Sequence, residues 1–326
     1  MIGQHARDLW AIYRLQKQGV PLDLRAAMLR PDSAFYRAVA RSMPGFGLWA
    51  GRVTTLVVRE RGRTGFVQAR WRNGGIPAQD LLFIAPSLDA RQGVTWLWQR
   101  LLHDLVQVSG SKGVQRLFAH LPEQRHAEVE VMRQSGFAIF AQDRLYRLMT
   151  LPLEVEKLDT PWVPQEKVDG WGLNRLYTAV TPAVVQQAES VLHDNGDGHA
   201  GGWGNPRQGC YVLRGSSAGD VLGYLRLTRG EHAHWVKLVL HPERVNQNAA
   251  LLQQGLSLMA NWPRRPVYCD VRDYEGFLAD PLERCGFERV MTRLLLVRHT
   301  TVSLRVKAAK PLPVMEGVPE AAPSPF

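Results

Sequence analysis

The sequence predicts an α/β protein built from two similar units in tandem. Its length of 326 residues, 45% of them hydrophobic, is sufficient for two domains of ordinary size. Strand-like and helix-like segments follow one another in the same order in both halves. In the first half, Gly65-Phe66 lies 21 residues before Pro86. In the second half, Gly223-Tyr224 lies 19 residues before Pro242, so a duplication is the economical explanation.

In the first half, apolar spacing and alternation define the elements. Apolar residues at i, i+3, i+4 and i+7 from Val94 to Leu105 predict an amphipathic helix. Two alternating runs joined by the RERGR turn predict a β-hairpin. The expected elements, in chain order, are helices at about 8–18 and 24–41, strands at Val53–Arg59, Gly65–Trp71 and Leu81–Ala85, the helix from Val94, a strand at about 115–120, a helix at about 124–135, and strand-like runs at Ala138–Ala141 and Arg144–Met149.

The second half repeats this order. Ala249, Leu252, Leu256 and Met259 lie on one face of a predicted helix. The expected elements, in chain order, are a helix at about 173–191, strands near 210–214 and 221–228, a strand at His234–Leu240, the helix through Ala249, a strand at Val267–Val271, a short helix before Gly286-Phe287, and a strand at Arg293–Arg298.

Proline-containing segments set the expected boundaries. Pro152, Pro161 and Pro164 interrupt a mixed-charge stretch with no apolar period, which predicts a linker over 151–169. Beyond Val306 the sequence holds five prolines and little to bury. The expected division is a domain at 1–150, the linker, a second domain at 170–306, and a disordered tail at 307–326.

The positive charge is confined to the first half. Residues 1–150 carry 21 Lys and Arg against 11 Asp and Glu, a net charge of +10, whereas residues 151–326 carry 19 against 19. Such a field suits an anionic ligand, either a phosphorylated cofactor or nucleic acid. Of the 21 cations, 19 are scattered arginines, so a solvated surface is an equally good explanation.

Composition also indicates a cellular compartment. No apolar stretch reaches the ~18 to 20 residues of a membrane span, and Arg7 and Asp8 interrupt the N-terminus where a signal peptide would be apolar. Cys210, Cys269 and Cys285 are odd in number and form no CxxC pair, which argues against a disulfide framework or a zinc knuckle. We therefore expect a cytoplasmic protein with cysteines used in packing.

Two sequence features carry a resemblance to a known family. A strand ends at Pro86 and runs through Arg91-Gln92-Gly93-Val94-Thr95 into a helix, and a later helix ends in Gly136-Phe137 before a final hairpin. These features resemble the GNAT superfamily of acyltransferases, here present twice over about 5–150 and 170–302, with both copies departing from the family pattern. The resemblance implies two GNAT-like domains, each a mixed, mainly antiparallel sheet flanked by helices, and acetyl-CoA as the acyl donor.

The loop after the fourth strand is the expected donor site of the first copy. In the family, the backbone amides of this loop and the following helix N-terminus hold the pyrophosphate of acyl-CoA. The resemblance assigns this role to Ile84, Ala85, Arg91, Gln92, Gly93, Val94 and Thr95. Ala90 stands where the family has Arg or Gln, and an ordinary strand-to-helix turn is the alternative. The second copy has no glycine between Pro242 and Leu251, so no donor site is expected there.

The candidate catalytic residue is Asp80, six residues before Pro86. In the family a carboxylate at this place takes the proton of the amine, whereas the alternative is a solvated acid at the start of a strand. The tyrosine that usually protonates the leaving thiolate is replaced by Met132 in the first copy and Leu282 in the second. Tyr146 and Tyr274 lie at the wrong distance from the motif to replace it.

Other motifs are weaker. His232 and His234 alternate on a predicted strand, but no nearby acid or cysteine completes a metal site, so no metal is expected. The loop at 193–207 lacks the order of a calcium loop. No GxSxG, Walker or GxGxxG motif occurs.

The leading hypothesis is an N-acyltransferase that moves an acetyl group from acetyl-CoA to a small-molecule or peptide amine in the first domain. The alternative is a catalytically silent tandem that binds CoA or a protein partner, and the third is a nucleic-acid-binding module using the basic half. We expect no nucleic acid and no membrane as partners, because no polybasic block, row of stacking aromatics or apolar span is present.

Overall fold

The structure is a computed structural model that describes residues 2–29, 35, 39, 53–72, 76–91, 93–149, 162–189, 208–217 and 219–300. The predicted tail at 307–326 and the loop at 193–207 lie outside these residues, as does the linker up to residue 161. None of the described helices is both long and apolar enough to cross a membrane. The three cysteines are free.

The elements of the first half extend from α1 to β6, and those of the second half from β7 to β12. The first half comprises α1 (Ile2–Leu15), η1 (Gln16–Gln18), β1 (Val20–Pro21), α2 (Leu24–Leu29), β2 (Val53–Glu60), β3 (Arg63–Trp71), β4 (Ala78–Ala85), α5 (Thr95–Ser111), β5 (Arg116–Pro122), α6 (His126–Gln134) and β6 (Ala138–Leu148). The second half comprises β7 (Val163–Pro164), η2 (Lys167–Asp169), α7 (Gly170–Val180), α8 (Ala183–Glu189), β8 (Gln208–Arg214), β9 (Val221–Arg229), β10 (His234–Leu240), η3 (Pro242–Gln247), α9 (Asn248–Ser257), β11 (Val267–Arg272), η4 (Asp273–Leu278), α10 (Ala279–Arg284) and β12 (Glu288–His299).

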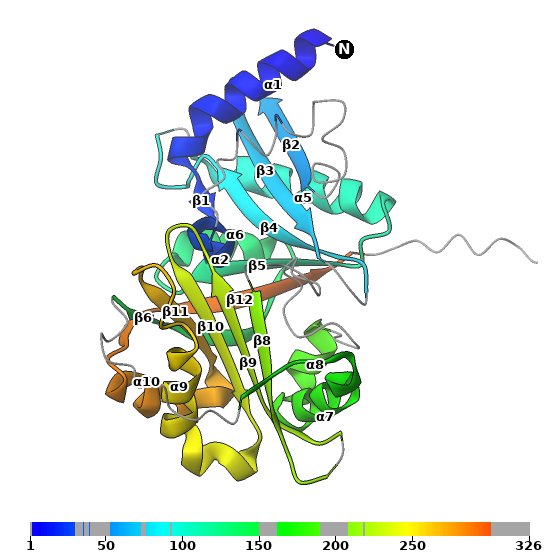
Figure 1. Ribbon diagram of the computed structural model, residues 1–326. Coiled ribbons are helices and arrows are strands. Elements are labelled where there is room, and N and C mark those ends of the chain that lie inside the picture. The colour runs from blue at the N-terminus through cyan, green and yellow to red at the C-terminus, as the bar shows by residue number, and fades with distance from the viewer. Residues whose placement is uncertain are drawn as a thin grey trace, which may run out of the picture.

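One continuous sheet runs through both halves (Figure 1). Its strand order is β2-β3-β4-β5-β12-β6-β11-β10-β9-β8-β7, with β1 paired to β4 off this path. The pairs β4/β5 and β10/β11 are parallel, and the other strand pairs are antiparallel. The prediction of an α/β fold with a mixed, mainly antiparallel sheet is therefore confirmed.

The last strand of each half is inserted into the sheet of the other half. The strand β12 lies between β5 and β6, and β6 lies between β12 and β11. The prediction of a final hairpin from Ala138–Ala141 and Arg144–Met149 is wrong, because β6 is one strand. Its middle residues cannot turn, since they pair with β12 on one side and β11 on the other.

Helices cover both faces of the sheet (Figure 1). The predicted amphipathic helix is α5, whose buried Leu97, Trp98 and Leu101 pack with α6 on one face of β3 to β5. On the opposite face, α1 buries Ile12 against Phe66. In the second half, α9 and α10 pack on one face, and α7 and α8 pack on the other.

Two predicted helices differ from the observed ones. The helix expected at 173–191 is two helices, because Thr181 is extended and the following Pro182 has no amide to continue the helix. The helix expected at 24–41 is observed as α2 up to Leu29, and most of the remainder lies outside the described residues.

Candidate functional site

The loop after β4 uses its backbone amides inside the protein. The amide of Ser87 donates to the carbonyl of Gln18 (2.6 Å), that of Ala90 to Ser87 (3.0 Å), and that of Gly93 to Ala90 (2.7 Å). The amide of Asp89 donates to the Ser87 hydroxyl (3.3 Å). A phosphate cradle needs free amides that point toward one place. These four amides are therefore not available to a pyrophosphate in this conformation.

Gly93 is required by the packing of the loop on itself. A Cβ atom at this position would lie 2.0 Å from the Ser87 carbonyl oxygen and 2.8 Å from the Leu88 Cα. A glycine in this motif normally lets a ligand approach the backbone, but here the approaching group is the backbone of the same loop.

The other predicted donor residues are placed around this loop. The carbonyl of Arg91 accepts a hydrogen bond from Arg63 (3.1 Å), and Gln92 lies outside the described residues. Val94 is the extended residue before α5, and Thr95 is its first residue. The structure thus places Val94 and Thr95 at the N-terminus of α5.

The edge of β4 is covered by a segment of the same chain. Val20 pairs with Ile84, the amide of Leu22 donates to the Leu82 carbonyl (2.9 Å), and the carbonyl of Leu22 accepts from the amide of His120 on β5 (3.1 Å). Val20 and Leu22 are each 1% exposed. The parallel pairing of β4 and β5 ends at Asp80 and Phe118, and we call the region between the two strands beyond this pair the first wedge. Residues 20–22 bridge β4 and β5 across the first wedge.

The location of residues 20–22 limits where an acyl donor could bind. A donor with its pyrophosphate at the loop after Pro86 and its thioester at Asp80 must run along β4 for six residues, or roughly 20 Å at ~3.3 Å per residue. Ile84 and Ala85, two predicted donor contacts, are fully buried. The path that the donor would follow is taken by β1 and Leu22.

Asp80 is buried at the closed end of the first wedge. It is 3% exposed, and Oδ1 accepts a hydrogen bond from Arg72 Nε (2.7 Å). The Arg72 guanidinium also lies 3.7 Å from the ring centroid of Phe118. The second carboxylate oxygen, Oδ2, is buried without a hydrogen-bond partner. Asp80 is thus not a solvated acid, and Oδ2 is the atom through which it could accept a proton.

A histidine that the sequence analysis did not single out lies beside this acid. Burial and the positive charge of Arg293 lower the pKa of His120 to about 4, against the opposing effects of Asp23, Asp143 and Asp80. The imidazole is therefore neutral at pH 7.

Two ion pairs flank the same region. Arg70 contacts Asp23 (3.0 Å), and Arg293 of β12 forms a bidentate pair with Asp143 of β6 (2.8 and 2.6 Å). The second pair is nearly fully buried and joins the exchanged strands of the two halves. Guanidinium groups hold the carboxylates around the first wedge in fixed positions.

Neither Tyr146 nor Tyr274 takes the place of the general acid of the family. Met132 and Leu282, at the two expected positions, are buried in the hydrophobic cores. Tyr146 is buried in the core of the second half, where burial raises its pKa. Burial, opposed by Arg272, raises the pKa of Tyr274 to about 12, and this side chain packs at Ala141 and Val185 rather than at Asp80.

The second half has a corresponding wedge beyond the last β10/β11 pair, Val236 and Cys269. Lys237 contacts Glu275 (2.9 Å) and Asp270 (3.8 Å) there. Burial by itself would lower the pKa of Lys237, but the two carboxylates outweigh it and raise the pKa. Among the described residues, no segment pairs with the edge of β10 as β1 does with β4.

His234, at the start of β10, and His241, just after its end, both have structural roles. His234 Nε2 lies 2.8 Å from the Pro263 carbonyl, and its ring meets Trp262 edge-on at 5.0 Å. His241 caps η3 by accepting from the Glu243 amide. Within the described part of the chain, no three His, Cys, Asp or Glu side chains are grouped so that they could hold a metal ion.

Comparisons with known proteins give only distant similarities. No protein-family model matches the chain, and no curated protein sequence does. A GCN5-related N-acetyltransferase from Sphaerobacter thermophilus is 15% identical with a TM-score of 0.47, over 89% of this chain and 92% of that one. A tandem GNAT protein from the clavulanic acid biosynthesis pathway is 14% identical with a TM-score of 0.47, over 79% and 88%. A functionally unknown conserved protein from Staphylococcus epidermidis is 13% identical with the same score, over 75% and 94%.

The two halves of the chain repeat one arrangement of strands and helices. Each half of the chain contributes an antiparallel meander, one parallel pair that diverges, and a helix that connects the two strands of that pair. At these identities and TM-scores the comparisons carry no argument about the fold or the activity of this chain.

The buried charges were missed although the sequence contains a signal for them. Asp143, Lys237, Asp270 and Arg293 are buried charged residues within strands that are otherwise mainly apolar. A charged residue must find a partner when its strand is buried. A charge inside an apolar strand is therefore the sequence signal for these four residues.

Proposed function

We propose that this tandem GNAT-like protein acts by binding and that its first half does not transfer acyl groups. The observation that carries this proposal is the pairing of Val20 with Ile84, which puts the chain itself on the path between the predicted donor loop and Asp80. The internal use of the loop amides of Ser87, Ala90 and Gly93 supports the same conclusion. In this conformation the residues of the first wedge do not fit an acyl-CoA.

The second candidate is N-acyl transfer by the first half, with acetyl-CoA as donor and a small-molecule or peptide amine as acceptor. The buried, unpartnered Oδ2 of Asp80 favours it, because a carboxylate oxygen held in place could accept the proton of an ammonium group. This activity requires residues 20–22 to leave the wedge. A cytoplasmic location and the absence of nucleic-acid and membrane partners also stay predictions.

The two candidates are separated by incubating the full chain with acetyl-CoA and a broad panel of amines while thiol release is measured. We expect no release above the rate without protein, and no difference between the native chain and Asp80→Asn. Turnover that Asp80→Asn lowers by ~10² to 10⁴, the contribution of a positioned base, would establish the second candidate. The variant Gly93→Glu is the control for donor binding at the loop: thiol release that depends on this binding should be lost in the variant.

A further inference from the structure

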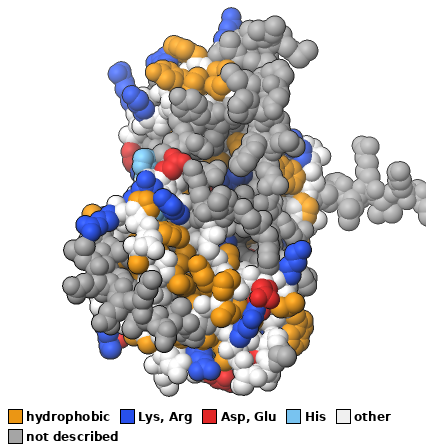
Figure 2. All heavy atoms as spheres, viewed as in Figure 1, with side chains coloured by type: hydrophobic (Ala, Val, Ile, Leu, Met, Phe, Trp, Pro, Cys, Tyr) orange, Lys and Arg blue, Asp and Glu red, His pale blue; other side chains and the backbone are white. Residues whose placement is uncertain are grey.

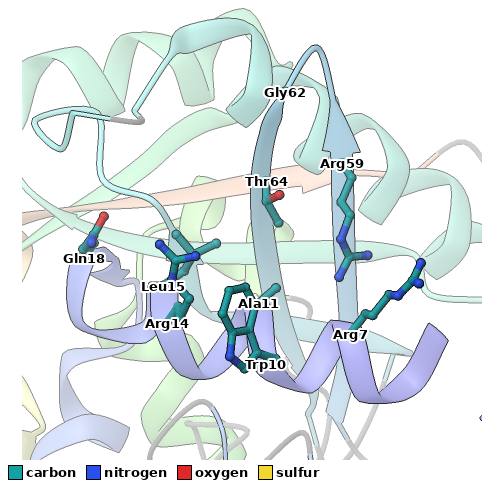
Figure 3. A pocket seen from close by; sticks show the side chains of 9 residues that line it. All are labelled: Arg7, Trp10, Ala11, Arg14, Leu15, Gln18, Arg59, Gly62 and Thr64. Atoms are coloured by element: carbon teal, nitrogen blue, oxygen red, sulfur yellow. The ribbon is translucent and has the colours of Figure 1, made fainter. Parts of the chain in front are cut away.

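A groove lies between α1 and the β2–β3 hairpin, away from the wedge and the donor loop. It encloses about 610 Å³ and is lined on one side by Arg7, Trp10 and Arg14, and on the other by Arg59 and Thr64 (Figure 3). None of the residues predicted to bind the donor lines it. Its volume falls in the range of small-molecule sites, ~300 to 1,000 Å³.

The groove is positively charged. Three of its lining residues are arginines, and none of the described lining residues is acidic. Asp8 neutralises Arg59 in part, at 2.5 Å, but Arg7 forms no ion pair with any described residue. In Figure 3 the Arg59 side chain extends from β2 toward α1, and the Arg7 side chain rises from α1 at the same end of the groove. A concave site with excess guanidinium groups attracts anions, above all phosphates.

The same groove presents an aromatic face. Trp10 is 60% exposed, and the Arg14 guanidinium lies 4.6 Å from its ring centroid. Figure 2 shows hydrophobic side chains beside Lys and Arg side chains on the part of the surface formed by α1. An exposed tryptophan ring is a stacking surface for a planar base, and a guanidinium can stack in the same way.

We propose that this groove binds a nucleoside di- or triphosphate, with the phosphates at Arg7 and Arg59 and the base at Trp10 and Arg14. The ligand must combine a planar ring with clustered negative charge, because the groove offers both features within a single small volume. A single small ligand is favoured over a polynucleotide, because the arginines and the exposed ring gather in one groove of about 610 Å³. The inference is independent of acyl transfer.

The test is isothermal titration of the full chain with ATP, pyrophosphate and adenosine. ATP binds most tightly, because only ATP engages both the arginines and the ring. Arg7→Glu lowers ATP and pyrophosphate affinity by at least about tenfold, since it replaces a charged hydrogen-bond donor with a repelling charge. Trp10→Ala lowers ATP affinity by about tenfold, the effect of losing a stacked base, but leaves pyrophosphate affinity unchanged.

Two controls keep the result specific. Arg284→Glu changes an exposed arginine of the second half, which is paired with Asp280, and leaves ATP affinity unchanged. Thr95→Glu puts a negative charge on the exposed first residue of α5 in the predicted donor site, so retained ATP binding separates this groove from the donor site. Because Arg7 makes no described ion pair, its substitution is not expected to unfold the chain, and thermal melting of each variant verifies this.

Several outcomes would overturn the proposal. These are no binding of ATP, equal affinity of native chain and Arg7→Glu for ATP, and equal loss of ATP and pyrophosphate affinity in Trp10→Ala. Binding of an oligonucleotide or of anionic lipid vesicles that exceeds ATP binding and is lost in Arg7→Glu would also overturn it, and would assign the groove to that partner.

Discussion

The first and second wedges are equivalent positions of the two units, but they are closed by different means. In the first wedge, backbone hydrogen bonds of Val20 and Leu22 connect β4 with the segment that also bonds β5. In the second, side-chain ion pairs between Lys237 and the acids Asp270 and Glu275 occupy the corresponding place. Diverging parallel strands leave backbone groups and charges that must be satisfied, and a ligand is one of several ways to do so.

The difference also concerns the loops that follow. The loop after the first wedge keeps a glycine, Gly93, but the space that its missing side chain leaves is filled by the Ser87 carbonyl of the same loop. The second has the helix η3 after His241 and no glycine in the loop. Retention of a motif residue therefore does not establish retention of its ligand.

The largest expected effect comes from separating the two units. Because β12 completes the sheet of the first half and β6 that of the second, fragments 1–150 and 151–326 expressed alone should not fold. Mixed or co-expressed, they should recover the circular dichroism and elution volume of the full chain. A folded, monomeric 1–150 fragment would show that the exchanged strands are dispensable and that the units can be compared as independent domains.

The next effect distinguishes the charges of the two wedges. Lys237→Met removes the cation from the buried carboxylates of Asp270 and Glu275. Among the described contacts, these carboxylates then keep only their hydrogen bonds from Trp235 and from the Arg272 amide, so the change should lower the free energy of unfolding by about 3–5 kcal/mol. Arg72→Met leaves one carboxylate, that of Asp80, without its guanidinium partner. Because Arg72 is the more exposed of the two cations, this change should lower the free energy of unfolding by about 1–3 kcal/mol. Urea denaturation measures both, and the double variant Lys237→Met/Glu275→Leu should recover part of the loss. Equal losses at the two sites would contradict the contrast between a strand-closed and a charge-closed wedge.

A third prediction concerns pH and involves only the first wedge. Burial and Arg293 lower the folded-state pKa of His120 to about 4, below the unfolded value of 6.5, so the unfolded state binds the proton more tightly. The neutral imidazole contributes stability above pH ~6.5, and this contribution, roughly 3 kcal/mol, is lost as the pH falls toward 4.

The measurement for this prediction is the unfolding free energy at pH 7 and pH 4. His120→Gln should reduce the loss between the two pH values, whereas the control His103→Gln, on the exposed face of α5, should not. An unchanged pH dependence in His120→Gln would show that this histidine does not titrate in the wedge region.

The smallest effect tests the role of Gly93. Gly93→Ala puts a Cβ 2.0 Å from the Ser87 carbonyl, so the loop must shift, and we expect a loss of about 1–3 kcal/mol without any ligand. The control Gly170→Ala, in helical backbone with no atom within 4 Å of the new Cβ, should stabilise the chain by about 0.5–1 kcal/mol. Thermal melting compares the two variants, and an unaffected Gly93→Ala would indicate a loop kept open for a ligand.

Sequence periodicity was sufficient for the elements that have a strong local pattern. The hairpin β2–β3 and the helix α5 were predicted because alternation and helical spacing extend over many residues. The strand β1 could not be predicted, since it has two residues, one of them Pro21, and its pairing depends on a distant strand.

The exchange of β6 and β12 between the two halves could not be predicted from the sequence either. The strands β6 and β12 have the same alternation whichever half they complete, so local pattern does not specify their neighbours. Asp80 was singled out as an acid six residues before Pro86, but its partner Arg72 and the neighbouring His120 become visible only when β3, β4 and β5 are placed side by side. The site therefore depends on tertiary contacts that a single sequence does not reveal.

Amide hydrogen exchange of the full chain with and without acetyl-CoA tests most directly whether β1 closes the first wedge. A peptide covering 18–24 reports on the Leu22 amide, and one covering 116–122 reports on the His120 amide, which donates to the Leu22 carbonyl. A peptide covering 234–240 serves as the reference. If residues 20–22 close the wedge, these peptides are protected and saturating acetyl-CoA leaves their exchange unchanged. Faster exchange of 18–24 upon addition of acetyl-CoA, together with thiol release that depends on Asp80, would contradict a closed wedge and a silent first half.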